Sequence, residues 1–329
     1  MRGSGLGSIY DWNFTTTAQP HPGNRTIDVK RGKVLGGSAA LNYLATGYLP
    51  LAGANLQVRT GTRVAKVEFS AGSMPLRATG VLLDNRTKIA ARREVILSAG
   101  SIQSSGLLEL SGIGQASLLK VAGINTLKEL AGVGENYQDH IRMSNVYRLK
   151  KNFSSFDPMI YESGGAYASE QMRLWLEGEA SWYDYTSSAY SFFNWGHVGN
   201  SSEAALLQLA RSDNQHNSVV DGKKLDFLMD PSVPQLEIIM EGSFVGATTA
   251  YPGNGSFATL ITSVMHPMSR GSVHINAADP KGAPVVDPRY LSHGYPFLCF
   301  GHNNRFYYGK YALCYLQSSL CGGQLSEAG

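Results

Sequence analysis

Glycines beside small polar residues are the groups in this sequence whose spacing best suits ligand chemistry. Gly36-Gly37-Ser38 lies in the stretch RGKVLGGSAALN, and a second glycine-rich stretch, GSIQSSGLLELSGIG, covers residues 100–114. Paired glycines let bare main chain lie against a flat ligand, and they permit the positive φ angles of an anion-binding turn. The two stretches therefore predict main-chain contact with a planar or phosphate-bearing molecule. A plain turn is the alternative explanation of either stretch taken alone.

The elements expected to position the second stretch are a strand and a helix. Glu94–Leu97 predicts an apolar strand, residues 98–100 a tight turn, and Gln103–Leu110 a helix that ends at Ser111-Gly112. This order brings backbone N–H groups up to a ligand, although an ordinary β–turn–α unit has the same pattern. Further strands are expected within 55–69, 78–92, 236–240 and 258–265, and after a turn that begins at His266.

These stretches resemble the two signatures of the glucose-methanol-choline (GMC) oxidoreductases, which hold FAD and oxidise alcohols. Two further stretches are similar to the family in the same order, VGENYQDH at 133–140 and HPMSRGSVHINAADPKGAPVVDPRY at 266–290. YDWNFTT and LGGSAALN are similar to the fungal aryl-alcohol and secondary-metabolite branch. The resemblance covers about residues 9–293 and implies oxidation of a small-molecule alcohol to a carbonyl.

The resemblance also implies which residues contact FAD. The loop after Arg31 would line the flavin, Val64 would supply backbone contacts to the adenine, and the turn at Ala99 and Gly100 would approach the adenine half. The complete set of implied cofactor-binding residues is Val34, Gly36, Gly37, Ser38, Asn42, Val64, Ala99 and Gly100. The match departs from the first signature at Ala39 and fails after Ala45.

The expected fold is α/β with mixed α+β character, divided into two domains and a tail. Residues 1–145 would form a partial FAD/NAD(P)-binding Rossmann-like domain, residues 146–293 an antiparallel-sheet substrate domain, and 294–329 a tail outside the family pattern. An internal deletion is expected near 47–49, where family members have a long excursion. The family's N-terminal GxGxxG unit is expected to be absent, because Gly3-Ser4-Gly5-Leu6-Gly7 matches its spacing without the flanking strand and helix.

No catalytic residue can be assigned from the resemblance. Family members remove the hydroxyl proton with a His beyond the HPxSRG stretch, and here only His302 has that position, in surroundings that do not match. We therefore expect a truncated, inactive chain. Two alternatives remain: a FAD-containing lyase or cyclase of the same family, and a non-catalytic remnant that binds ligands through the aromatic cluster at Trp175–Trp195. Core packing explains that cluster equally well.

Composition bounds the remaining possibilities. With 329 residues, 43% hydrophobic and 16% charged, the chain is expected to be globular, and a net charge of +3 without a basic run argues against nucleic acid or an anionic membrane as partner. Cys299, Cys314 and Cys321 give neither a disulfide framework nor a metal site. No signal peptide is expected, whereas six Asn-X-Ser/Thr sites hint at a secreted ancestor. Oligomeric state is left open.

Overall fold

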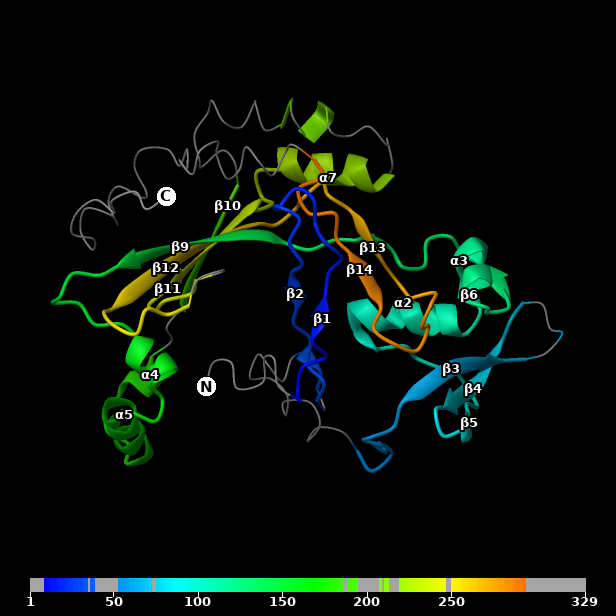
Figure 1. Cartoon of the computed structure of the whole chain (residues 1–329), viewed down its shortest axis with the longest axis horizontal. Coiled ribbons are helices and arrows are strands. Elements are labelled where there is room, and N and C mark those ends of the chain that lie inside the picture. The colour runs from blue at the N-terminus through cyan, green and yellow to red at the C-terminus, as the bar shows by residue number, and fades with distance from the viewer. Residues whose placement is uncertain are drawn as a thin grey trace. The chain divides into compact units, whose positions relative to one another are not determined.

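The computed structural model describes residues 9–34, 36–38, 53–70, 72, 75–185, 188–194, 207–208, 210–212, 219–246 and 250–293. Their contacts divide the chain into two units, whose elements are labelled in Figure 1. The first unit comprises the described residues of Met1–Gln138 and Ser269–Tyr290, and the second those of Asp139–Met268 and Leu291–Gly329. No helix in the described part of the chain has both the length and the hydropathy to cross a bilayer.

The first unit has its core where helix α2 meets strands from both ends of the chain. Helix α2 (Gly100–Leu110) packs on a three-stranded sheet of order β14-β13-β8, made of β14 (Val285–Asp287), β13 (Gly271–His274) and β8 (Glu135–Tyr137). The paired strands β1 (Phe14–Thr15) and β2 (Asp28–Val29) complete it. The buried core residues are Phe14, Val29, Ile102, Tyr137, Val273 and Val286. Segments far apart in sequence thus share one apolar cluster.

Helix α2 ends where the sequence predicts, because a glycine follows its C-cap. Gly112 has a φ of +84°, and its N–H donates to the carbonyl of Glu109 at 2.9 Å. A Cβ at Gly112 would lie 2.6 Å from the carbonyl oxygen of Asn125, so a larger residue does not fit. The buried hydroxyl of Ser111 accepts the N–H of Val67 at 2.8 Å and links the helix to the next sheet.

That next sheet is antiparallel, of order β3-β4-β5, and includes the hairpin expected within 78–92. Strands β4 (Ala78–Leu83) and β5 (Lys88–Ala90) are joined by the turn at 84–87, and β3 (Val64–Phe69) pairs with β4. The remaining small elements are β6 (Ile113–Gly114), α3 (Ala116–Val121) and β7 (Lys128–Glu129). β6 and β7 are the only parallel pair among the named strands of the described residues.

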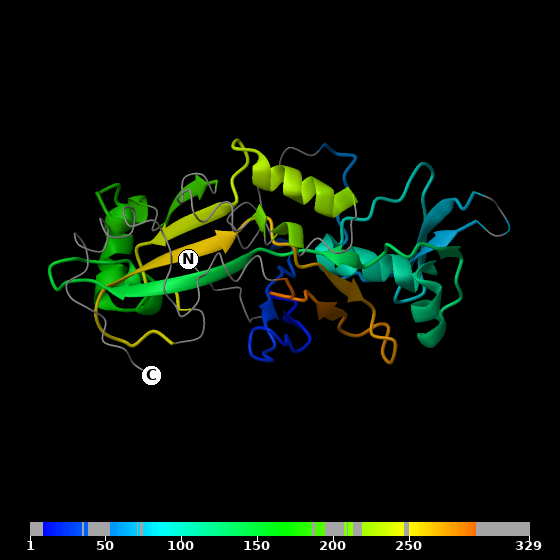
Figure 2. The same cartoon turned by 90° about the horizontal axis from the view of Figure 1, so that it is seen from above.

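The second unit consists of an antiparallel sheet with short helices, and an antiparallel sheet was expected in this part of the chain. The strand order is β10-β11-β12-β9, from β10 (Ser188–Phe193), β11 (Leu236–Glu241), β12 (Phe257–Val264) and β9 (Ile141–Arg148). Helix α7 (Val219–Met229) lies alongside the sheet (Figure 2), where Leu228 packs with Leu236 and Val264. The other helical elements are α4 (Asp157–Tyr161), α5 (Ala166–Leu176) and η2 (Trp182–Asp184).

Three sequence predictions of local structure are wrong. Glu94–Leu97 is not a strand, and Ile96 is 75% exposed, because no neighbouring strand pairs with this segment in the described residues. Residues 55–60 are likewise outside any strand. Of the stretch 55–69, where strands were expected, only Val64–Phe69 forms one. The aromatic cluster is not a common core: Trp175, Tyr185, Tyr190 and Phe192 are exposed, whereas Phe193 packs on the core of the second unit.

The segment 269–290 belongs to the first unit by its contacts, although in sequence it comes after Asp139–Met268, which belongs to the second unit. The predicted boundary between residues 145 and 146 falls inside β9. The assignment of the two regions to cofactor and substrate stays a prediction, and so does the internal deletion. Residues 294–329 lie outside the described residues.

Candidate functional site

The first glycine loop has the backbone geometry expected from its sequence. Gly36 and Gly37 have φ angles of +91° and +57°, and the N–H of Gly37 donates to the carbonyl of Val34 at 2.9 Å. The hydroxyl oxygen of Ser38 accepts the N–H of Gly32 at 3.1 Å. These two hydrogen bonds fold the loop back on itself. As a result, neighbouring main chain crowds one side of the loop more than the other.

One side of this loop is closed and the other is open. A Cβ at Gly32 would lie 2.4 Å from the carbonyl oxygen of Gly37, whereas a Cβ at Gly37 would meet no atom of the described residues within 4 Å. Gly32 is therefore required by contact within the loop. At Gly37 the requirement comes from backbone conformation, and the space beside it is available to a ligand.

The turn at Ala99 and Gly100, where α2 begins, also combines a positive φ with open space beside a glycine. Gly100 has a φ of +82°, and a Cβ there would also meet no atom within 4 Å. Ala99 is the N-cap of α2, and it makes no side-chain capping hydrogen bond, nor does the first helical turn contain an acidic residue. The N–H groups at this helix end and the positive end of the helix dipole favour an acceptor or an anion.

The other predicted cofactor-binding residues have positions that neither support nor contradict contact with a ligand. Val64 is the first residue of β3, is partly buried and pairs with Leu83. Val34 supplies the carbonyl that closes the glycine loop. Asn42 lies outside the described residues. Both glycine turns belong to the first unit, but no hydrogen bond among its described residues joins one turn to the other.

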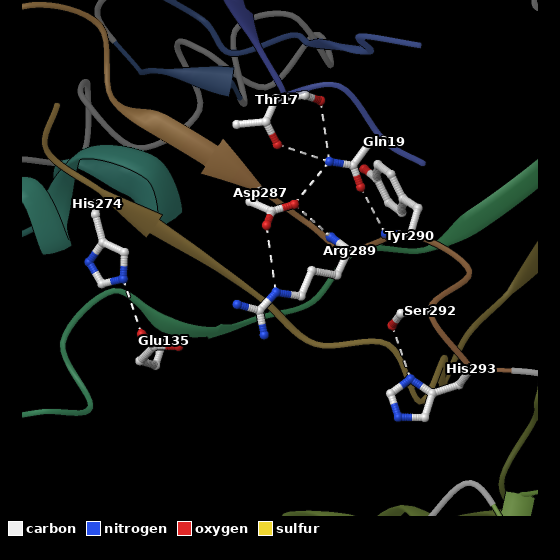
Figure 3. A network of polar contacts seen from close by, with 9 residues as sticks. All are labelled: Thr17, Gln19, Glu135, His274, Asp287, Arg289, Tyr290, Ser292 and His293. Atoms are coloured by element: carbon white, nitrogen blue, oxygen red, sulfur yellow. Dashed lines mark hydrogen bonds and ion pairs between the residues drawn. The ribbon is translucent and has the colours of Figure 1, made fainter. Parts of the chain in front are cut away.

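A buried glutamine that the sequence did not single out ties the N-terminal strands to the end of the 266–290 stretch (Figure 3). The Nε2 of Gln19 donates to the carbonyl and hydroxyl oxygens of Thr17, both at 3.2 Å, and to the Asp287 carboxylate at 3.0 Å. Its Oε1 accepts the N–H of Tyr290 at 3.0 Å. Gln19 is fully buried, so these partners satisfy a side chain that burial would otherwise penalise.

A second polar cluster joins a histidine to two carboxylates. The Nδ1 of His274 lies 2.6 Å from Oε1 of Glu109, and its Nε2 lies 3.1 Å from Oε1 of Glu135, as Figure 3 shows for the latter. The hydrogen bond to Glu109 is the main cause of a raised pKa of His274, against the opposing effect of burial. Glu109 is the one charged residue of α2. This isolated charge is the only feature of the sequence that could have indicated a polar contact at this position.

A second histidine with an altered pKa, His266, lies in the second unit. Its ring packs against Phe227 with centroids 5.3 Å apart. Burial lowers the pKa of His266, and His140 and Lys224 lower it further. Among the described residues no group of three or more His, Cys, Asp or Glu side chains has the arrangement of a metal site.

Comparison with known proteins places these features in a family. The profile described as GMC oxidoreductase matches residues 44–142. The chain is 30% identical over 244 residues to an alcohol oxidase of Candida boidinii, across 72% of this chain and 35% of that protein. It is 31% identical over 290 residues to the dehydrogenase mpl7 of Monascus purpureus, across 77% of this chain and 45% of that protein.

The fold also agrees with that of a solved structure. A structure described as a FAD-dependent oxidoreductase from Chaetomium thermophilum aligns with a TM-score of 0.68 and 18% identity, over 87% of this chain and 70% of that one. This likeness concerns the fold. The chain spans less than half the length of the two curated relatives.

Proposed function

This chain belongs to the GMC oxidoreductase family, and we propose that it binds FAD through its two glycine turns without itself turning over an alcohol. The observation that carries the proposal is the combination, at Gly37 and Gly100, of a positive φ with open space beside the main chain. Gly100 lies within residues 44–142, which match the family profile, and Gly37 lies in a stretch that resembles the start of the family's first signature. The family reaction is oxidation of a CH–OH group of a small-molecule alcohol, and placement in the aryl-alcohol branch is part of the proposal.

The residues present fit FAD in two chemical respects. The open side of the Gly36–Gly37 loop offers main chain without side chains, which suits a planar ring system, and Val34 and Ser38 are part of the same loop. Asn42, outside the described residues, is included from its place in the sequence. The N–H groups at Ala99 and Gly100 offer hydrogen-bond donors at a helix end, with Val64 supplying further backbone contact. When bound, FAD would supply a hydride acceptor for the carbinol carbon of an alcohol.

The second half of the proposal is that the chain does not turn over an alcohol. The reason lies in removal of the hydroxyl proton, not in transfer of the hydride to FAD. Oxidation of an alcohol also requires a base for the hydroxyl proton. His274, the histidine most firmly fixed in the first unit, has both ring nitrogens against carboxylates, which favours its protonated form and leaves it no lone pair to accept a proton. The short connection between Asn42 and Asn55 would also leave out residues that cover the flavin in the family.

The test is a dye-linked assay on the purified full chain supplied with FAD. We expect saturable flavin binding and no reduction of an artificial electron acceptor when a panel of aliphatic and aromatic alcohols is added. Acceptor reduction that depends on both the alcohol and the chain would overturn the claim of inactivity. Carbonyl product from an alcohol, identified by mass spectrometry, would confirm that reversal and identify the substrate class.

A further inference from the structure

The cluster of Glu109, His274 and Glu135 connects three stretches that the sequence analysis treated separately. Glu109 lies in the second glycine-rich stretch, Glu135 in VGENYQDH, and His274 in the stretch 266–290. In the structure they belong to α2, β8 and β13 of the same unit. A polar group that joins three elements at their meeting point controls how those elements are held together.

Each contact in the cluster is made at short range and one carboxylate is removed from solvent. Glu109 is 0% exposed, and its two oxygens have different partners: Oε1 faces His274 Nδ1 at 2.6 Å, and Oε2 accepts the N–H of Ile275 at 2.8 Å. Glu135 is near the surface and faces the other ring nitrogen. A buried carboxylate is costly unless it is paired, so the buried Glu109 favours a positive charge on the ring beside it.

The main chain is shaped to receive this ring. Gly134 has a φ of +81°, and a Cβ there would lie 2.6 Å from His274 Nδ1 and 2.5 Å from the carbonyl oxygen of Val273. Gly114 similarly approaches Glu109, whose Cγ would be 3.1 Å from a Cβ at that position. Gly134 therefore leaves no room for a larger residue beside the ring, and Gly114 lies close to the buried carboxylate.

We propose that Glu109, His274 and Glu135 form a proton-dependent clamp, in which a protonated His274 holds the end of α2 to β8 and β13 and loses that hold when it is deprotonated. The clamp is independent of flavin binding. It acts on the stability of the first unit, which contains both glycine turns.

The groups that face His274 account for its charge preference. From α2 the facing group is Glu109, and from β8 it is Glu135. On β14 the residue paired with His274 is the apolar Val285. Both carboxylates raise the pKa of His274, Glu109 through its hydrogen bond most of all, while burial lowers it.

The direction of the pH effect follows from this raised pKa. A proton held more tightly in the folded than in the unfolded chain stabilises the folded state. The stabilisation is therefore fully present below the ordinary histidine pKa of about 6.5 and is lost as the pH rises through the higher folded value. Alkaline conditions should weaken the attachment of α2.

The experiment is an NMR titration of the full chain together with thermal unfolding, both without flavin. We expect the His274 ring resonances to titrate above the ordinary histidine pKa of about 6.5. We also expect the unfolding temperature of the first unit to fall by about 3 °C or more between pH 6 and pH 9.

Substitutions separate the clamp from general alkaline destabilisation. Glu135→Gln removes the surface carboxylate, so the titration midpoint of His274 should move down while the fold is kept. His274→Gln should flatten the pH dependence of unfolding. A His274 midpoint at or below the ordinary value of about 6.5 would overturn the proposal, even if His274→Gln fails to fold. Parallel pH curves for the unaltered chain and His274→Gln would overturn it too.

Discussion

At the scale of single residues, the proposed ligand binding of the first unit depends on two glycines. At Gly37 and Gly100 the backbone adopts a conformation that costs other residues energy, yet no neighbouring atom of the described residues requires a small residue there. By contrast, Gly32, Gly112 and Gly134 are needed because another part of the chain approaches them closely. Glycines of the first kind are the ones whose replacement should affect a ligand more than the fold.

Replacing Gly37 by valine should weaken FAD binding strongly. The side chain would occupy the open side of the loop, so we expect the dissociation constant for FAD to rise by tenfold or more. The matched control is Gly123→Val, since Gly123 has a similar φ of +70° and equally open surroundings after α3. Each variant should lose about 1–2 kcal/mol of stability from backbone strain. Equal flavin affinity in the two variants would contradict the assignment.

Residue-level prediction succeeded where the signal is local. The positive φ angles of the paired glycines follow from residue type and neighbours, and they are found at Gly36 and Gly37. The roles of Gln19 and His274 could not be predicted in this way. Their partners Asp287 and Glu109 lie 268 and 165 residues away in sequence, and nothing in a single sequence pairs them.

Among the elements, helix α4 depends on one buried carboxylate. The two oxygens of Asp157 accept the N–H groups of Phe244 at 2.6 Å and Phe257 at 2.8 Å, as well as the Ser155 hydroxyl at 2.6 Å. Phe244 and Phe257 also pack edge to face with Tyr251. Asp157 thereby joins the start of α4 to the loop after β11 and to the start of β12.

Asp157→Ala should destabilise the second unit by about 3 kcal/mol, because two buried N–H groups lose their acceptor. Urea unfolding followed by tryptophan fluorescence measures this, since Trp182 packs against Phe156 beside the site. Asp184→Ala is the control: it removes the capping box of η2, an effect of about 1 kcal/mol. A smaller loss for Asp157→Ala than for Asp184→Ala would show that the buried bonds do not hold this helix.

Element-level prediction depended on whether an element needs a distant partner. Helix α2 and the β4–β5 hairpin form from local signals, and both are found near the predicted residues. Glu94–Leu97 has an apolar strand composition, but a strand is stable only with a neighbour, and the described residues provide none. Composition alone therefore overpredicts strands at such positions.

At the scale of the whole molecule, the first unit is assembled from two segments separated by the second unit. Strands β13 and β14 supply Val273 and Val286 to its core, as well as His274 to its polar cluster. The sequence suggested a simple order of domains along the chain. The return of 269–290 depends on packing between remote segments, which no local pattern reports.

A chain that ends at Met268 should therefore lose the structure of its first unit. Two of the six core residues and the partner of the buried Glu109 would be missing. We expect backbone amides of α2 to exchange with solvent as in an unfolded chain, measured by hydrogen exchange with mass spectrometry. The control is the full-length chain under the same conditions, and equal protection of α2 in both would contradict the assembly described here.

The claim that the two glycine turns form a flavin site is tested most directly by measuring FAD binding to the purified full chain. Equilibrium dialysis, with the bound flavin confirmed by its visible absorbance, gives the number of sites. The account predicts saturation at one FAD per chain. Absence of saturable binding by chain that is demonstrably folded would contradict it.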